Sequence, residues 1–238
     1  MQLKAEKLSI GYGNDKVVFG NISLVAAEGD MVALLGVNGI GKSTLLRTMA
    51  GLQKSVSGHL FVNGIDLQSL SVTERAKLVS IVLTERIYID NITVHSFIAL
   101  GRAPYTSWLG QLSTDDEREI AQVITVMKIE SLLPKMFNEL SDGERQKVLI
   151  ARALCQQTPL IILDEPTAFL DFRNKRAILS TLKQVCTELN KTVVLSTHDI
   201  ETALEFCNKC WIMTEQREFC EVLSSNKYEA EVKKILNY

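Results

Sequence analysis

Glycines followed by a lysine and a serine mark residues 36–44, which read GVNGIGKST. Such spacing lets the backbone curl so that successive N–H groups point inward at phosphate oxygens, and a following helix adds the positive end of its dipole. Lys42 would reach the β- and γ-phosphates of ATP, and the Ser43 hydroxyl would bind Mg²⁺. A glycine-rich turn that only joins a strand to a helix is the simpler alternative, but it requires neither the lysine nor the serine. The nucleotide-binding candidates here are Gly36, Asn38, Gly39, Gly41, Lys42, Ser43 and Thr44.

An acidic pair follows the apolar run at residues 160–163. A phosphate-binding loop needs a metal-binding acid at the end of a neighbouring buried strand, and Asp164 has that position. Glu165 would face the other way and polarise the water that attacks the γ-phosphate. A solvated pair of carboxylates at a strand end is the alternative. The predicted chemistry is therefore hydrolysis of a phosphoanhydride.

The segment 140–146, which reads LSDGERQ, resembles the LSGGQ signature of ATP-binding-cassette (ABC) ATPases. Ser141 followed by Glu144 is also an ordinary capping box on a helix that runs through Leu149 and Leu154. Both interpretations hold together, because a capped helix start is a place where an anion binds. In this family two copies close head to tail, so Ser141 and Gly143 would contact the γ-phosphate held by the other copy.

The resemblance extends over nearly the whole chain. It implies that Tyr12 stacks on adenine, that residues 168–171 form the D-loop with Asp171 in the nucleotide site, and that His198 is the switch histidine near the γ-phosphate. Tyr12 alone would be an aromatic packed at a strand end, and His198 alone an ordinary surface or core histidine. Their order along the chain favours the functional interpretation. The predicted catalytic residues are Glu165, His198 and Lys42.

Three positions depart from the family pattern. Thr84, followed by Glu85, stands where the family usually has a glutamine after a strand at residues 79–83. Its hydroxyl is shorter than a glutamine amide, so we expect Thr84 to reach Mg²⁺ or the attacking water only through another water. Asp142 and Glu144 replace a glycine and a glutamine of the signature. Two carboxylates beside a γ-phosphate would repel it unless turned away, so we expect weaker closure of the dimer.

These residues require elements that bring them together. β-prone segments at 3–10, 17–25 and 31–35 precede a helical pattern at 42–49. From 71 to about 133 the pattern is mostly helical, with capping boxes predicted at Ser71 with Glu74 and at Thr114 with Glu117. Strands and helices then alternate, which indicates a mostly parallel sheet.

The predicted fold is therefore an α/β, P-loop NTPase core with a mostly parallel sheet. The family resemblance adds an N-terminal antiparallel β subdomain and an inserted helical subdomain at about 85–155. We expect residues 1–238 to form a single ATPase domain.

Composition narrows the class of partner. The 26 basic and 28 acidic residues give a net charge of -2, which argues against nucleic acid. The apolar runs at 31–36 and 160–163 are too short to span a bilayer, and the N-terminus has no signal-peptide pattern. The five cysteines are irregularly spaced, and Cys207 and Cys210 form a lone C-x-x-C. This favours buried thiols over a metal or redox site.

The moving part driven by hydrolysis would then be another chain. Residues 93–102, TVHSFIALGR, with Pro104, Tyr105 and Trp108 after them, resemble ATPases of bacterial importers for iron–siderophore, haem and vitamin B12. The resemblance implies a second copy of the chain, integral-membrane permease subunits that dock on residues 85–112, and indirectly an extracytoplasmic binding protein. It places the chain at the cytoplasmic face of the inner membrane as a peripheral protein. The ATPase of an exporter, a soluble non-transport ABC ATPase and a small-molecule phosphotransferase are the alternatives.

Overall fold

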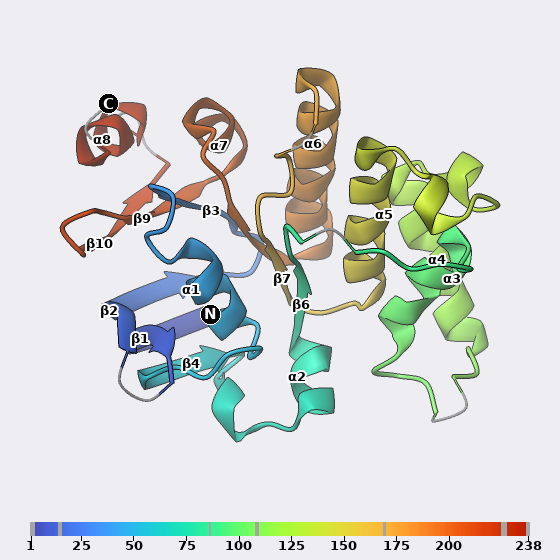
Figure 1. The fold of residues 1–238 in the computed structure, drawn as a ribbon, viewed down its shortest axis with the longest axis horizontal. Helices are drawn as coiled ribbons and strands as arrows, with labels where there is room; N and C mark the ends of the chain where they lie inside the picture. Colours follow the sequence, from blue (N-terminus) through green and yellow to red (C-terminus); the bar gives the residue numbers. More distant parts are fainter. Residues whose placement is uncertain are drawn as a thin grey trace.

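The chain folds into two β-sheets with a group of helices at one side (Figure 1). The computed structural model describes residues 3–13, 16–85, 87–107, 110–168, 170–224 and 228–236. The smaller, four-stranded sheet has the order β2-β1-β4-β5. Its strands are β1 (Leu3–Tyr12), β2 (Lys16–Ala26), β4 (Ser57–Val62) and β5 (Ile65–Asp66). All its pairings are antiparallel, which confirms the predicted N-terminal β subdomain. The sequence did not predict β4.

The larger, six-stranded sheet has the order β10-β9-β3-β8-β7-β6. Its strands are β3 (Met31–Gly36), β6 (Val79–Val82), β7 (Leu160–Leu163), β8 (Thr192–Ser196), β9 (Lys209–Met213) and β10 (Phe219–Leu223). All pairings are parallel except that of β10, an edge strand antiparallel to β9 that the sequence did not predict. The expected mostly parallel sheet is confirmed.

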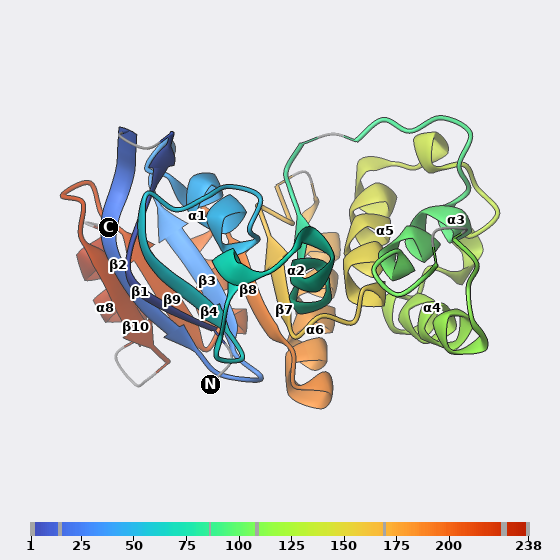
Figure 2. The same cartoon turned by 90° about the horizontal axis from the view of Figure 1, so that it is seen from below.

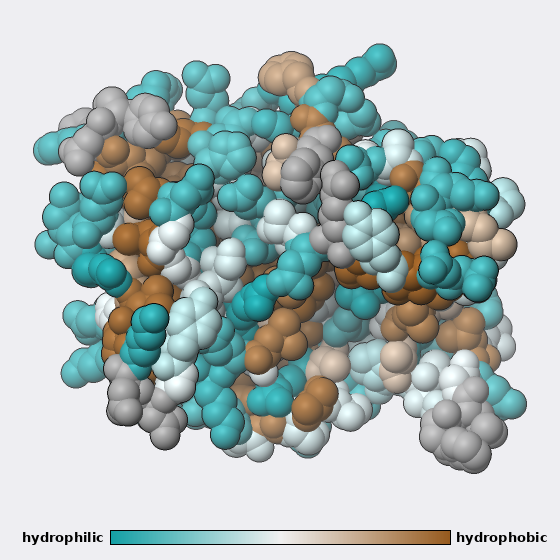
Figure 3. Space-filling view, in the orientation of Figure 1, coloured by the Kyte–Doolittle hydropathy of each residue, from teal (hydrophilic) through white to brown (hydrophobic). Residues whose placement is uncertain are grey.

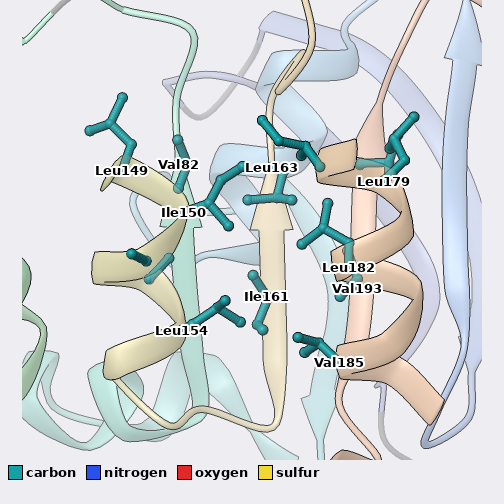
Figure 4. Packing of buried hydrophobic residues seen from close by; sticks show 14 of the residues in the cluster. Val82, Leu149, Ile150, Leu154, Ile161, Leu163, Leu179, Leu182, Val185 and Val193 are labelled. Carbon is teal, nitrogen blue, oxygen red and sulfur yellow. The ribbon is translucent and has the colours of Figure 1, made fainter. Parts of the chain in front are cut away.

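Both faces of this sheet are buried, which explains why its central strands are apolar without alternation. Ile161 and Leu163 of β7 point toward α5 (Asp142–Cys155) and α6 (Phe172–Leu189) (Figure 4). Leu160 and Ile162 belong to the opposite cluster, with α1 (Lys42–Met49) and the smaller sheet. Helices α7 (Ile200–Phe206) and α8 (Tyr228–Ile235) lie near β9 and β10, as Figure 1 shows.

Helices α3 (Val94–Ala99) and α4 (Thr114–Met127) gather with α5 on one side of the core, as Figures 1 and 2 show. The rings of Phe97 and Phe137 stack inside this group with centroids 4.2 Å apart. Short 3₁₀ turns complete the connections: η1 (Leu67–Ser69), η2 (Leu100–Arg102), η3 (Glu130–Leu132) and η4 (Phe137–Glu139). The predicted inserted helical region is confirmed, although α2 (Val72–Leu78) and β6 occupy the first part of the stretch from residue 71.

The capping box of α2 has the predicted residues. In α4 the N-cap and its acidic partner both lie one residue earlier in the chain than predicted. Ser71 and Glu74 cap α2. In α4 Ser113, not Thr114, is the N-cap, and Asp116, not Glu117, completes the box. The earlier start has a physical reason, because it places the Asp116 carboxylate where it also accepts a hydrogen bond from Arg102 at 2.7 Å.

The buried Asp116 should make the helical region sensitive to acid. Its pKa is lowered to about 2, first by hydrogen bonds from Ser113 and then by Arg102. A carboxyl whose folded pKa is depressed stabilises the fold above its unfolded pKa of about 4, and that stability is lost as pH falls toward 2. We expect Asp116→Asn to lower the free energy of unfolding at pH 7 by about 3 kcal/mol, since it leaves the charge of the buried Arg102 without its carboxylate.

Urea unfolding followed by circular dichroism at pH 7, 4 and 3 measures this effect. Asp115→Asn is the matched control, because Asp115 pairs with Arg118 at the exposed surface of the same helix. The control should stay within about 0.5 kcal/mol of wild type. An Asp116→Asn protein whose stability falls with acid as steeply as the wild type would contradict the prediction.

The cysteines form no disulfide among the described residues, and four of the five are buried. Cys207 and Cys210 lie under α8, where the Tyr228 hydroxyl is 3.0 Å from the Cys210 sulfur. Burial raises the pKa of both thiols. In the part of the chain that the structure describes, no helix is long and apolar enough to cross a membrane.

Candidate functional site

The loop between β3 and α1 has three positions at which the backbone conformation or its surroundings favour glycine. Gly39 and Gly41 have φ of 79° and 118°. A Cβ at Gly36 would lie 2.7 Å from the Met213 carbonyl oxygen, and one at Gly41 would lie 2.9 Å from a methyl of Val18. Gly41 is the N-cap of α1 and supplies no side-chain cap. The first N–H groups of the helix therefore lack a capping side chain and can bind an anion.

Lys42 is the first residue of α1, and its side chain turns back toward this loop. Its side chain is buried, and its ammonium donates to the carbonyl oxygens of Gly36 at 2.7 Å and Val37 at 3.2 Å. Desolvation lowers the pKa of Lys42, while the charges of Glu165 and Asp164 oppose that shift. The positively charged ammonium therefore lies close to the free backbone N–H groups at the start of α1. A polyphosphate binds to this combination of a cation and hydrogen-bond donors.

The acidic pair lies at the same edge, because β3, β8 and β7 are adjacent parallel strands whose carboxyl ends meet there. Asp164 is buried, with the residue 6% exposed, and its carboxylate accepts a hydrogen bond from the Ser196 hydroxyl at 2.6 Å. The Glu165 carboxylate instead lies 3.5 Å from Nδ1 of His198. The two acids therefore have different partners, and the predicted base and switch histidine are neighbours.

Ser196 is a site residue that sequence reasoning missed. It ends β8, and besides bonding Asp164 it accepts the backbone N–H of Glu165 at 2.8 Å. Its position two residues before His198 at the end of an apolar strand was the available signal. Glu165 has a φ of 48°, a conformation that non-glycine residues adopt only when their surroundings fix it.

The oxygens at this edge fit Mg²⁺. Asp164 offers a carboxylate and Ser43 a hydroxyl, and magnesium prefers such hard ligands, taking one or two from protein and the rest from phosphates and water. The Thr84 hydroxyl reaches the same place but donates to the backbone carbonyl of Asp164 at 2.9 Å.

Tyr12 stands beside the start of α1. Its side chain is 58% exposed, and its hydroxyl is 3.3 Å from Oγ1 of Thr44. An exposed ring next to the phosphate-binding helix is where a stacking partner for a base is needed.

The signature segment begins α5. Ser141 is its N-cap, and the Glu144 carboxylate closes the capping box and accepts from the Lys135 ammonium at 2.8 Å. These bonds, with Lys135 first, lower the pKa of Glu144 to about 2. Glu144 is therefore turned to its own helix start, and a lysine balances its charge. Asp142 remains half-exposed, 4.0 Å from Arg145. The expectation of weaker dimer closure now rests on Asp142 and stays a prediction.

The signature and the phosphate-binding loop are not brought together within one chain. Strands β6 and β7 lie between α5, which Ser141 caps, and α1 (Figures 1 and 2). Asp171 is the N-cap of α6, where its carboxylate accepts from the Asn174 backbone at 2.9 Å and side chain at 2.7 Å. Phe169 of the predicted D-loop and Trp108 of the predicted docking surface lie outside the described residues.

Comparison with known proteins agrees with this geometry. Residues 19–168 match a family model described as "ABC transporter", and residues 135–205 also match one for an AAA domain. An uncharacterized ABC transporter ATP-binding protein of Methanocaldococcus jannaschii is 40% identical over 97% of this chain and 79% of its own length. The Bacillus subtilis iron(3+)-hydroxamate import ATP-binding protein FhuC is 34% identical over 86% of this chain and 76% of its own.

Two solved structures share the fold. An ABC transporter assigned to the metal-chelate type, in an inward-facing conformation, aligns with a TM-score of 0.84 and 27% identity, covering 99% of this chain and 88% of the other. A dimeric ATP-binding cassette in a post-hydrolysis state, bound to ADP and Pi, aligns with a TM-score of 0.81 and 27% identity, covering 94% and 99%.

Proposed function

We propose, because the chain belongs to the ABC transporter family, that this ATP-hydrolysing transporter subunit energises import of a metal chelate through a separate permease. The cargo class would be iron–siderophore, haem or cobalamin. One observation carries the ATP-hydrolysing part of the proposal: Lys42, Asp164, Glu165 and His198 converge at one edge of the sheet, while the signature residues begin α5, away from that edge. We also propose that residues 1–238 form one ATPase domain with a helical insertion at about 85–155.

In the proposed mechanism each residue at the sheet edge has a stated part. Lys42 and the N–H groups at the start of α1 hold the β- and γ-phosphates, and Ser43 and Asp164 would hold Mg²⁺. The ion, when bound, would neutralise charge that develops on the phosphates. Glu165 orients the attacking water and accepts its proton, and His198 lies beside it toward the γ-phosphate.

Gly143 supports a composite site made by two copies. Glycine in a helix costs about 1 kcal/mol relative to alanine. Among the residues that the structure describes, a Cβ at Gly143 would meet only a methyl of Leu170, at an ordinary contact distance of 3.5 Å. Packing within the chain therefore does not require glycine there. The approach of a second copy's nucleotide to Ser141 and Gly143 supplies a reason, and Tyr12 and Asp171 would complete the binding surface.

Docking on a separate permease is supported by exposed apolar side chains near the helical region, and the direction of transport by the names of relatives. Tyr88 is 75% exposed, and Leu100 and Tyr105 are also exposed. Figure 3 shows apolar side chains at the surface of this region as well as over the core. Several relatives are named as siderophore or iron-hydroxamate ATP-binding proteins. We infer a peripheral position at the cytoplasmic face of the membrane and, indirectly, an extracytoplasmic binding protein.

Transport by the reconstituted complex tests the proposal. The chain would be purified from membranes with its integral-membrane partner and placed in liposomes with ATP inside or outside. Labelled ferric hydroxamate siderophore, haem and cobalamin would be the probes. We expect ATP on the side of this chain to drive one of them toward that side, at least tenfold above a complex that carries Glu165→Gln. Movement in the opposite direction would indicate an exporter. If the chain copurified with no membrane partner, it would be a soluble ABC ATPase.

A further inference from the structure

The Thr84 hydroxyl extends the pairing of β6 with β7 by one hydrogen bond. The strands pair in the register Val82 to Leu163, and the Asp164 N–H donates to the Val82 carbonyl at 2.8 Å. In a parallel ladder the next bond would join the backbone N–H of residue 84 to the Asp164 carbonyl. The Thr84 side chain occupies that acceptor instead, with its hydroxyl donating at 2.9 Å. The chain can thus leave β6 while the carbonyl of Asp164, the residue that follows β7, keeps a partner.

A second hydroxyl holds the other side of the same peptide group. The Glu165 N–H donates to Ser196 of β8 at 2.8 Å, and the Ser196 hydroxyl donates to the Asp164 carboxylate at 2.6 Å. The peptide group between Asp164 and Glu165 is therefore bonded from both sides, by Thr84 in the segment that follows β6 and by Ser196 at the end of β8. A peptide plane fixed at both its N–H and its C=O determines where the next side chain points.

This arrangement matters because Glu165 has an unfavourable backbone conformation. With a φ of 48° it lies in the left-handed region, which costs about 1 kcal/mol or more for a residue with a Cβ. Such a residue keeps its conformation only when its surroundings impose it. Without the bond from Thr84, the peptide group could rotate and move the Glu165 carboxylate away from His198, now 3.5 Å distant.

We propose that Thr84 is a positioning residue for hydrolysis, acting through the Asp164 carbonyl to hold Glu165 in place. It does so without touching nucleotide or metal, in contrast to the metal role expected from the sequence. The inference rests on the proposed function, because it takes Glu165 as the group that activates water. It gives the threonine that replaces the family's glutamine a defined task in this chain.

The adjacent residue provides a matched control. Glu85 forms an ion pair with Arg47 of α1, and both side chains are substantially exposed. Exposed pairs of this kind contribute little. Glu85→Gln alters the same loop without touching the Asp164 carbonyl, so its kcat should stay within about twofold of wild type.

The test compares Thr84→Val, which keeps the shape but removes the donor, with Thr84→Ser, which keeps the donor. We expect Thr84→Val to lower kcat about tenfold, the order expected when a part-buried carbonyl loses its hydrogen bond, with KM for ATP and the Mg²⁺ requirement unchanged. Thr84→Ser should recover kcat to within about threefold of wild type. In a Glu165→Gln background Thr84→Val should cause no further loss, since both changes act on one group.

Three results would overturn the inference. An unchanged kcat in Thr84→Val would show that the bond is dispensable. A raised Mg²⁺ requirement, with kcat restored at saturating Mg²⁺, would make Thr84 a metal ligand. An equal loss in the wild-type and Glu165→Gln backgrounds would indicate a general structural effect. Failure of the proposed function is recognised separately, because Glu165→Gln alone would then hydrolyse ATP like wild type.

Discussion

Glu165→Gln should leave only a small residual rate of ATP hydrolysis and convert the chain into a dimer that persists only with ATP. The amide matches the carboxylate in shape but cannot accept a proton, and loss of a general base lowers rates about 10²- to 10⁴-fold. The backbone at Glu165 is held by Ser196, so the variant should keep its conformation. ATP would still bind to Lys42 and the start of α1, and the closed pair would no longer be released by hydrolysis. Phosphate release and size-exclusion chromatography with light scattering measure both effects.

Ser141→Arg in the Glu165→Gln background is the control that tests whether Ser141 of one copy contacts the nucleotide bound to the other. Ser141 caps α5 and is exposed, so a longer cationic side chain there would obstruct a partner's nucleotide while leaving Lys42 and Asp164 untouched. We expect this double variant to bind ATP and remain monomeric. A Glu165→Gln protein that stays monomeric with ATP and hydrolyses it at the wild-type rate would contradict both the base assignment and the composite site.

The features that sequence predicted well are local ones. The phosphate-binding loop was recognisable because glycines, a lysine and a serine must follow one another within nine positions. The central strands were recognisable because burial on both faces makes them continuously apolar. The structure confirms the parallel sheet and the N-terminal antiparallel sheet. It places Lys42, Asp164, Glu165 and His198 together, while their catalytic roles stay predictions.

The features that sequence missed depend on contacts between distant segments. Ser196 is 32 residues from Asp164, and the Thr84 hydroxyl is 80 residues from the carbonyl that it bonds. No local pattern reveals such a pair. The sequence predicted that Glu144 would repel a phosphate unless it was turned away. The structure shows that Lys135 neutralises the Glu144 carboxylate, and nothing within the signature indicates this contact. Edge strand β10 was missed because a glutamate interrupts its five residues, FCEVL, and burial of Val222 alone leaves no continuous buried run like those of the central strands.

Lys42→Met should weaken ATP binding about 100-fold and with it eliminate hydrolysis at ordinary ATP concentrations. The Lys42 ammonium is buried, and its hydrogen bonds to Gly36 and Val37 show that it already points into the loop that would enclose the phosphates. Charge-assisted hydrogen bonds contribute about 1.5–3 kcal/mol, and each 1.4 kcal/mol is a factor of ten in Kd. Methionine keeps the length of the side chain and supplies no charge. Isothermal titration calorimetry with ATP and Mg²⁺ measures Kd directly.

Lys191→Met is the matched control for the loss of a desolvated lysine. Burial lowers the pKa of Lys191 as it does that of Lys42, and its ammonium also donates to a carbonyl, that of Gln157, at 3.2 Å. The neighbours of Lys191 are outside the nucleotide site, so the Kd of the Lys191→Met variant for ATP should equal that of wild type. In the nucleotide-free state both variants should change the free energy of unfolding by about 1 kcal/mol, since lost hydrogen bonds and relieved desolvation offset each other. Equal weakening of ATP binding in the two variants would show that a general loss of packing, and not phosphate contact, explains the effect at Lys42.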